Sequence, residues 1–151
     1  LYQIVFDAQT AGINAAINGA SFRAVSEATN EVVQKGLLAL GLIEKKEDFR
    51  RYLPHGISHH IGLDVHDPGL YDKLSPSMVI TVEPGIYIPE GSPCDPKWWN
   101  IGIRIEDDIL ITETTPINLS SNAPRSWKDI EAVMAKKSAL DNFVLPELSI
   151  D

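Results

Sequence analysis

The sequence lacks most of the features of a disulfide-bonded, nucleic-acid-binding or membrane protein. It has one cysteine, Cys94, so no disulfide can form within the chain, which fits a reducing compartment. Only 13 lysines and arginines oppose 21 aspartates and glutamates, and the formal net charge is −8. Because phosphate backbones are bound mainly by clustered Lys and Arg, we expect no nucleic-acid partner. No apolar run is long enough to cross a bilayer, so we also expect no membrane partner.

The start of the chain lacks further signals. No initiator methionine and no capping residue precede the amphipathic helical pattern of Leu1, Ile4, Val5 and Ala8. No charged, apolar and small-residue sequence of a secretory leader opens the chain. We therefore expect residues 1–151 to be a segment of a longer protein.

Helical patterns lie at the two ends of the chain. Apolar residues recur at intervals of three and four over residues 1–18 and again over about 24–40. Gly19 and Gly41 follow these two patterns as helix stops. Residues 126–137 predict a third helix, with a serine N-cap and lysines in the last turn, where the helix dipole favours cations.

The middle of the chain predicts a sheet. After a charged segment, residues 44–54, that holds at most a short helix, glycines and β-branched residues predominate. They favour strands over residues 78–88 and 101–112, joined by a surface loop rich in Pro, Gly and Ser at residues 89–100. Helices followed by strands and a closing helix predict an α+β fold with an antiparallel or mixed sheet.

All four histidines lie in one segment, HGISHHIGLDVHDPG, residues 55–69. On an extended segment, side chains at even separations share a face, so His55 and His59 point one way and His60 the other. A lone histidine in a sheet is more often a packed structural residue than a ligand. Three histidines at spacings of four and seven, with His66 as the third, make a functional site a stronger hypothesis.

Two carboxylates lie inside the predicted strands, Glu83 and Glu106. A buried carboxylate needs a cation, a metal ion or a proton to offset the loss of its hydration. For Glu106 alone, an ion pair with Arg104 on a solvated face is an equally good explanation. Together with His59, however, the two glutamates form a nitrogen-and-oxygen ligand set suited to Mn, Co, Fe or Zn. The sequence therefore favours a metal site.

Three segments carry a resemblance to a known family: HGISHHIGLDVHDPG, VITVEPGIYI and GIRIEDDILIT. In this order and spacing they resemble the catalytic half of the pita-bread metallopeptidases, most closely the Xaa-Pro aminopeptidases (aminopeptidase P). The likeness runs from about Leu1 to the last predicted helix. It implies a partial pita-bread fold, with helices packed on a curved, mostly antiparallel sheet. Residues 1–151 would then be the C-terminal part of the catalytic domain.

The resemblance also implies the activity. Members of the family hydrolyse the N-terminal Xaa-Pro peptide bond with a hydroxide that bridges two divalent metal ions, here expected to be Mn. The substrate is a peptide with proline in the second position. His59 matches a histidine ligand of one metal, Glu83 a carboxylate ligand that also handles the proton of the attacking water, and Glu106 the carboxylate that bridges both metals. A cytoplasmic, homo-oligomeric parent enzyme is implied as well.

Three further residues match positions of the family that act on the substrate. His66 matches a histidine that hydrogen-bonds the substrate near the scissile carbonyl. His55 matches a histidine that lines the same pocket, and Arg104 an arginine beside the pocket for the residues after the cleaved bond. With Glu83, these are the expected catalytic residues. His60 falls where family members differ, and we expect a structural role for it.

The sequence departs from the family in one respect. Two aspartate ligands and a further active-site histidine lie upstream in the family, and this chain has no such segment. Asp7 lies in the first predicted helix and Glu44, Glu47 and Asp48 in the charged segment, so none replaces the missing ligands. We expect the isolated chain to lack two-metal occupancy and peptidase activity, and to self-associate through its uncovered sheet.

Other interpretations stay open. A prolidase shares the same ligands but cleaves only dipeptides. A non-catalytic pita-bread module that binds peptides or proteins is a second alternative. Methionine aminopeptidases do not usually carry the GIRIEDD context, and creatinase-type enzymes lack much of the ligand pattern.

Overall fold

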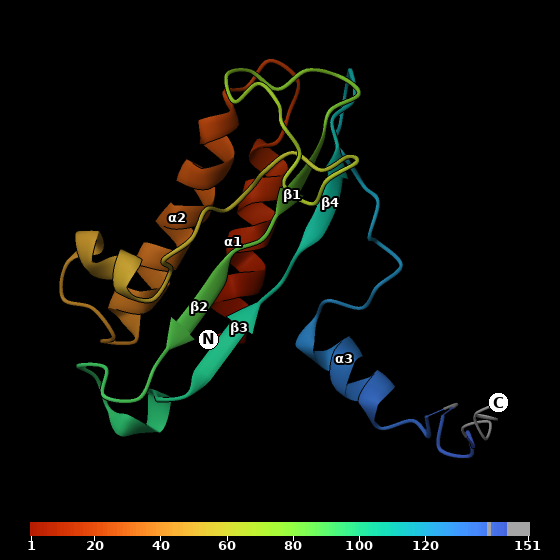
Figure 1. Ribbon diagram of the computed structural model, residues 1–151. Helices are drawn as coiled ribbons and strands as arrows, with labels where there is room; N and C mark the ends of the chain where they lie inside the picture. Colours follow the sequence, from red (N-terminus) through yellow and green to blue (C-terminus); the bar gives the residue numbers. More distant parts are fainter. Residues whose placement is uncertain (139, 145–151) are drawn as a thin grey trace, which may run out of the picture.

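The computed structural model describes residues 1–138 and 140–144, so the end of the predicted domain, residues 145–151, lies outside the described part. Two long helices come first, then short strands with 3₁₀ helices before and between them, and then a third helix (Figure 1). This order confirms the α+β class predicted from the sequence.

The two leading helices, α1 (Tyr2–Ala15) and α2 (Phe22–Ala39), pack side by side. The Ser21 hydroxyl accepts a hydrogen bond from the backbone N–H of Ala24 at 3.1 Å and so caps α2. Gly41, with a φ of 67°, follows the end of α2 in the left-handed conformation that favours glycine. Both helices were predicted, and the second lies within two residues of its predicted bounds.

The first helix is shorter than predicted and ends at Ala15, before Gly19. The backbone of the turn that follows is hydrogen-bonded to a distant segment. The Gly19 N–H donates to the Leu74 carbonyl at 2.8 Å, and the Leu74 N–H donates to the Ala20 carbonyl at 2.8 Å. Backbone groups that pair with a distant segment cannot continue the helix. This pairing fastens the α1–α2 turn to the segment that leads into the sheet.

Each of the two predicted strands is split in two. The strands are β1 (Val79–Val82), β2 (Gly85–Ile88), β3 (Ile101–Arg104), β4 (Asp107–Leu110) and β5 (Ile117–Asn118). β1 pairs antiparallel with β4, β5 extends β4, and β2 pairs antiparallel with β3. Pro84 has no N–H and lies at the break between β1 and β2. The glutamates at positions 83 and 106 stand at this break, on opposite strands.

A further extended segment, residues 57–61, lies beside β1. The backbone N–H of Thr81 donates to the His59 carbonyl at 2.9 Å, and neighbouring backbone bonds continue the pairing on both sides. The 3₁₀ helix η1 (Lys46–Arg51) precedes this segment, as the charged sequence suggested, and η2 (Pro96–Trp98) lies in the predicted surface loop.

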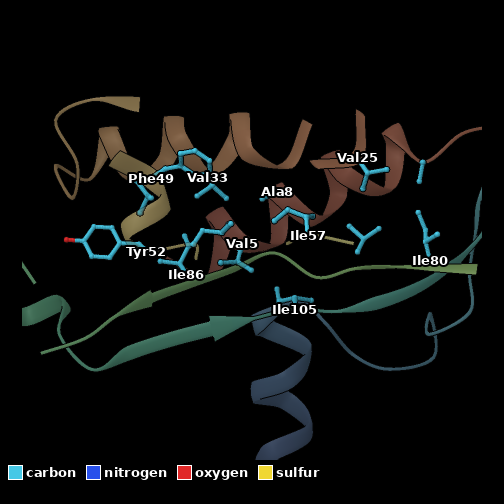
Figure 2. Packing of buried hydrophobic residues seen from close by; sticks show 14 of the residues in the cluster. Val5, Ala8, Val25, Val33, Phe49, Tyr52, Ile57, Ile80, Ile86 and Ile105 are labelled. Carbon is cyan, nitrogen blue, oxygen red and sulfur yellow. The ribbon is translucent and has the colours of Figure 1, made fainter. Parts of the chain in front are cut away.

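The hydrophobic core lies between the helices and the strands. Figure 2 shows α1 between α2 and the strands, with Val5 and Ala8 of α1 fully buried. Ile80 of β1 and Ile86 of β2 are also fully buried. Burial of such side chains contributes about 1.5–3 kcal/mol each, so the strands on both sides of Pro84 are held against the helices.

The third helix, α3 (Trp127–Met134), has no buried residue and extends away from the rest of the molecule (Figure 1). Ser126 is its N-cap, as predicted, and its hydroxyl accepts from the Asp129 N–H at 3.1 Å. The helix ends three residues before its predicted end at 137. Among residues 1–138 and 140–144, no helix has the length and apolar character needed to cross a membrane.

Candidate metal centre

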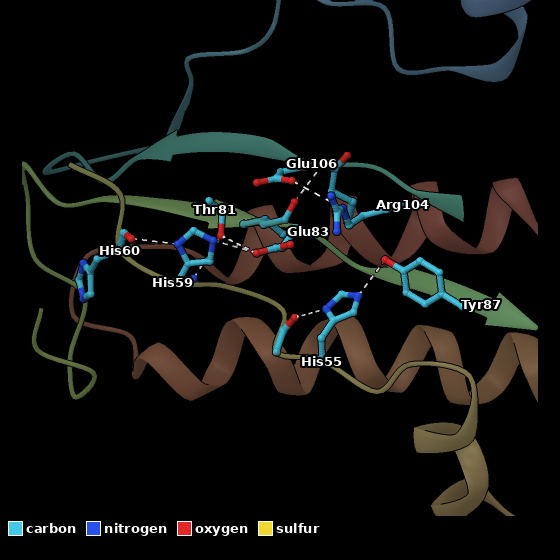
Figure 3. Close-up of polar contacts among 11 residues, drawn as sticks. His55, His59, His60, Thr81, Glu83, Tyr87, Arg104 and Glu106 are labelled. Atoms are coloured by element: carbon cyan, nitrogen blue, oxygen red, sulfur yellow. Dashed lines mark hydrogen bonds and ion pairs between the residues drawn. The ribbon is translucent and has the colours of Figure 1, made fainter. Parts of the chain in front are cut away.

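His59, Glu83 and Glu106 converge on one point (Figure 3). One ligand atom of each lies within 4.8 Å of those of the other two. His59 Nε2 is 2.9 Å from Glu83 Oε1, and both side chains are 13% exposed. In the described part of the chain this is the one group of three or more His, Cys, Asp or Glu side chains with such geometry. The structure thus brings together the three ligands expected from the sequence.

Thr81 connects two of these residues and is not among the site residues predicted from the sequence. Its hydroxyl accepts from the backbone N–H of His59 at 3.1 Å and donates to Glu83 Oε1 at 3.4 Å. Thr81 is fully buried. Its even spacing from Glu83 on one strand is the signal that could have identified it, since such side chains share a face.

The environment of His59 decides which ring nitrogen carries hydrogen. Nδ1 lies 2.9 Å from the His60 carbonyl oxygen, which can only accept, so Nδ1 must donate. The Nε2 lone pair then faces the Glu83 carboxylate, which is also an acceptor. Two acceptors 2.9 Å apart require a proton or a cation between them. A histidine fixed by a carbonyl in this way is the usual form of a metal-ligating imidazole.

The surroundings of Glu106 also favour a bound cation next to its carboxylate. Partial burial raises the pKa of Glu106, and the nearby Glu83 raises it further, while Arg104 and His59 act in the opposite direction. Arg104 Nε is 3.7 Å from Glu106 Oε2, and these two side chains are 52% and 40% exposed. The ion pair expected as an alternative is therefore present, but an exposed pair contributes at most about 1 kcal/mol.

The three residues fit a divalent metal ion. Nitrogen and oxygen donors converge, the histidine presents a lone pair, and two neighbouring carboxylates lack full compensation of their charge. Three protein ligands leave coordination positions free for water, substrate or further ligands.

A cavity of about 390 Å³ opens beside this group. It is lined by five of the six residues predicted for the site together with two others: His55, Gly56, Ser58, His59, His66, Glu83 and Arg104. Ser58 was not predicted; its hydroxyl is buried and has no hydrogen-bond partner among the described residues. No pattern in the sequence distinguishes this serine from others.

The two outer histidines have distinct settings. The His66 ring packs edge-on against the His59 ring, with centroids 4.4 Å apart. His55 Nδ1 donates to the Gly56 carbonyl at 2.6 Å, so its Nε2 accepts from the Tyr87 hydroxyl at 2.9 Å (Figure 3). His60 lies on the other side of its segment, as the alternation predicted, and is 7% exposed.

The acidic residues that the sequence excluded as replacement ligands do not join the group. Asp7 accepts from the Gln3 side chain at 2.8 Å on the exposed face of α1. Glu47 and Asp48 lie in η1, and Glu44 is exposed just before it. None of these four supplies a fourth or fifth ligand in the part of the molecule described here.

Similarity to known proteins agrees with this site. Residues 1–113 match metallopeptidase family M24. The Xaa-Pro aminopeptidase of Escherichia coli (strain K12) is 39% identical over 149 residues, covering 89% of this chain and 33% of that protein. Xaa-Pro aminopeptidase 3 of Rattus norvegicus is 37% identical over 147 residues, covering 91% of this chain and 29% of that protein.

Solved structures show the same fold. That of Pseudomonas aeruginosa aminopeptidase PepP superposes with a TM-score of 0.84 at 36% identity, over 89% of this chain and 34% of that one. This confirms the partial pita-bread fold. The chain spans about a third of the length of the curated relatives it matches. Because the family match covers most of the chain, the chain belongs to metallopeptidase family M24.

Proposed function

We propose that residues 1–151 form the C-terminal part of the catalytic domain of an Xaa-Pro aminopeptidase, which cleaves the bond between an N-terminal residue and a following proline. The observation that supports this most is the convergence of His59, Glu83 and Glu106 beside a cavity. Relatives 37–39% identical are named Xaa-Pro aminopeptidases. The cytosol is the expected location.

His59, Glu83 and Glu106 are the residues of this chain that would hold a pair of divalent ions, with Mn as the expected metal. Such ions, when bound, polarise a peptide carbonyl and lower the pKa of a water to near neutrality. The ligands of this chain are preorganised. The Thr81 hydroxyl donates to Glu83 Oε1, and the His60 carbonyl accepts from His59 Nδ1. This leaves donor atoms aimed at a common point before any ion arrives.

The remaining residues act on protons and on the substrate. Glu83 is the proposed general base, taking a proton from water at a carboxylate oxygen and passing it to the proline nitrogen as that nitrogen leaves. His66 and His55 line the cavity. A ring N–H of His66 can donate to the scissile carbonyl as negative charge develops on it, whereas both ring nitrogens of His55 are bonded to Gly56 and Tyr87. Arg104 places a guanidinium at the cavity wall beside the residues that follow the cleaved bond.

The chain alone supplies one wall of this site. The resemblance implies two aspartate ligands in a segment that precedes these residues, and the relatives are about three times as long. Without the aspartates, two dications held close together would repel each other with too little negative charge to offset the repulsion.

We therefore expect the 151-residue chain to bind fewer than two Mn²⁺ ions per molecule and to be inactive. Isothermal titration with Mn²⁺ measures the stoichiometry, and an Xaa-Pro tripeptide assay measures the activity. Hydrolysis by this chain with added Mn²⁺ would show that three ligands suffice.

The direct test of the proposed function uses the full-length protein that contains residues 1–151. It should release the N-terminal residue from an Xaa-Pro-Yaa tripeptide when Mn²⁺ is supplied, and much more slowly from the matched Xaa-Ala-Yaa peptide. Cleavage of Xaa-Pro dipeptides alone would identify a prolidase instead. Tight peptide binding without any cleavage would support the non-catalytic module, although the intact His59, Glu83 and Glu106 set argues against it.

We further propose that the chain forms homo-oligomers. Apolar side chains are exposed around β5, where Ile117 and Leu119 are 50% and 54% exposed, and the loop residue Leu63 is fully exposed. Exposed apolar groups beside a sheet edge favour association. Sedimentation velocity at increasing concentration should show a dimer or larger species. A single monomeric species at high micromolar concentration would contradict this expectation.

A further inference from the structure

His60 is enclosed by two aromatic rings from distant parts of the chain. Its ring centroid lies 5.1 Å from that of Phe22, at the start of α2, and 5.0 Å from that of Tyr71. Phe22 and Tyr71 also contact each other edge-on at 4.6 Å. This three-ring cluster joins the helical layer to the loop of residues 61–73, which carries His66.

The loop is also bonded to the His60 ring. His60 Nε2 lies 3.0 Å from the Leu70 carbonyl, which can only accept, so Nε2 donates. The backbone of Gly69 lies directly on the ring, since a Cβ at this position would collide with it. Only glycine permits this approach, and the loop therefore closes tightly over His60.

The carbonyl of His60 connects the same loop to the metal centre. It accepts from the Asp67 backbone N–H at 3.0 Å and from His59 Nδ1 at 2.9 Å. Both lone pairs of one oxygen are thus used, one by a proposed metal ligand and one by the residue that follows His66. The His66 ring in turn packs on the His59 ring at 4.4 Å.

We propose that His60 is a positioning residue that fastens the loop of residues 61–73 and so holds His66 against His59 at the cavity. The catalytic meaning of this inference rests on the proposed function, but the fastening itself does not. His60 is not an additional metal ligand, because its ring lies between Phe22 and Tyr71 and its Nε2 is already bonded to Leu70.

Two variants distinguish the contribution of the His60 aromatic ring from that of its N–H donor. His60→Phe keeps a ring between Phe22 and Tyr71 but cannot donate to Leu70, whereas His60→Gln keeps an N–H donor but loses the ring. Tyr71→Phe is the matched control, because it keeps the ring that packs against His60 and removes only the hydroxyl. His60 is buried and Tyr71 is 54% exposed, so the fold of each variant is compared with that of the parent chain before either measurement.

The first measurement is amide hydrogen exchange on the 151-residue chain. In His60→Phe, exchange at the Asp67 amide should become about tenfold faster, which corresponds to loss of one hydrogen bond that holds the loop. Exchange at the Thr81 amide of β1 should change less than about twofold, and Tyr71→Phe should change neither. Equal acceleration at Asp67 and Thr81, or no acceleration at Asp67, would overturn the proposal.

The second measurement uses the full-length enzyme with an Xaa-Pro tripeptide. Removal of a group that orients an active-site residue typically costs 10–100-fold, so kcat should fall about tenfold in His60→Phe while KM changes little. His60→Gln, which restores the donor, should recover part of kcat. A change in KM alone would overturn the proposal. Absence of any Xaa-Pro hydrolysis in the parent enzyme refutes the proposed function and leaves the exchange result to decide the role of His60.

Discussion

Replacing Glu106 with glutamine is expected to lower kcat/KM for an Xaa-Pro tripeptide by at least about 10³-fold in the full-length enzyme. Glutamine keeps the shape of the side chain but removes the negative charge at the point where His59 and Glu83 meet it. A carboxylate that binds metal supplies several kcal/mol of charge stabilisation, and about 4 kcal/mol corresponds to 10³ in rate. Steady-state kinetics and metal analysis of the same sample measure the effect.

The matched control is Asp108→Asn. Asp108 lies two residues further along, in β4, and contributes only a minor share of the charge that raises the pKa of Glu106. It is not part of the ligand group. We expect Asp108→Asn to keep kcat/KM within about threefold of the parent value, because the half-buried Asp108 carboxylate does not belong to the ligand group. Equal losses in both variants would mean that Glu106 acts through general charge and not as a ligand.

In the metal-free protein, Glu106→Gln should raise the stability of the fold. Because burial and Glu83 raise the pKa of Glu106 in the folded chain, the charged carboxylate is disfavoured there at neutral pH. This cost is absent below the ordinary pKa of a glutamate and appears as the pH rises through the raised value. Metal-free Glu106→Gln should therefore unfold at a slightly higher temperature than the parent at pH 7. A lower melting temperature would indicate that Glu106 is structural.

The ligand group could be predicted from the sequence because chemistry limits it. Few environments tolerate two carboxylates within β-branched strands, so Glu83 and Glu106 could be identified as candidate ligands. The alternation of side chains along residues 55–60 placed His59 and His60 on opposite faces and so distinguished the ligand from the structural histidine. The break at Pro84 was missed, although a proline inside a strand run is a signal that the run is interrupted. The pairing partners, β4 for β1 and β3 for β2, show that the run is divided there.

Contacts between distant segments account for the rest. Nothing near His60 in the sequence indicates Phe22 as its neighbour, and nothing near Val82 indicates Gln9, whose amide donates to the Val82 carbonyl. Such contacts depend on how α1 and α2 lie against the strands, which local patterns do not encode. The early end of α1 has the same origin, because the turn after it pairs with Leu74.

A buried polar network lies behind the break that carries the two glutamates. Asp107 is 3% exposed, and its Oδ2 has no hydrogen-bond partner among the described residues. The nearest cation is Arg125, whose NH1 group is 3.6 Å from this oxygen and donates to Gln9 Oε1 at 2.6 Å. Gln9 is fully buried and its amide donates to the Val82 carbonyl at 3.1 Å. The network therefore joins α1 to the residues next to both glutamates.

Replacing Arg125 with methionine is expected to lower the free energy of unfolding by about 3 kcal/mol. Methionine has no guanidinium, so it loses the cation–π contact with the Phe6 ring and leaves the Asp107 carboxylate buried without a counter-charge. Removing one partner of a buried pair costs about 3–5 kcal/mol, and the low end applies because the Arg125 side chain is 30% exposed. Urea denaturation of the 151-residue chain measures the change, and the melting temperature should fall by roughly 6–12 °C.

The double variant Arg125→Met with Asp107→Asn decides whether charge is the cause. Once the carboxylate is neutral, loss of the arginine no longer leaves a buried charge unpaired, so the double variant should be more stable than Arg125→Met alone. Additive losses would instead mean that the bond to Gln9 carries the stabilisation. Asp107 adjoins Glu106 and pairs with Val82, which adjoins Glu83, so a charge left unpaired here lies one residue from each carboxylate along the two strands.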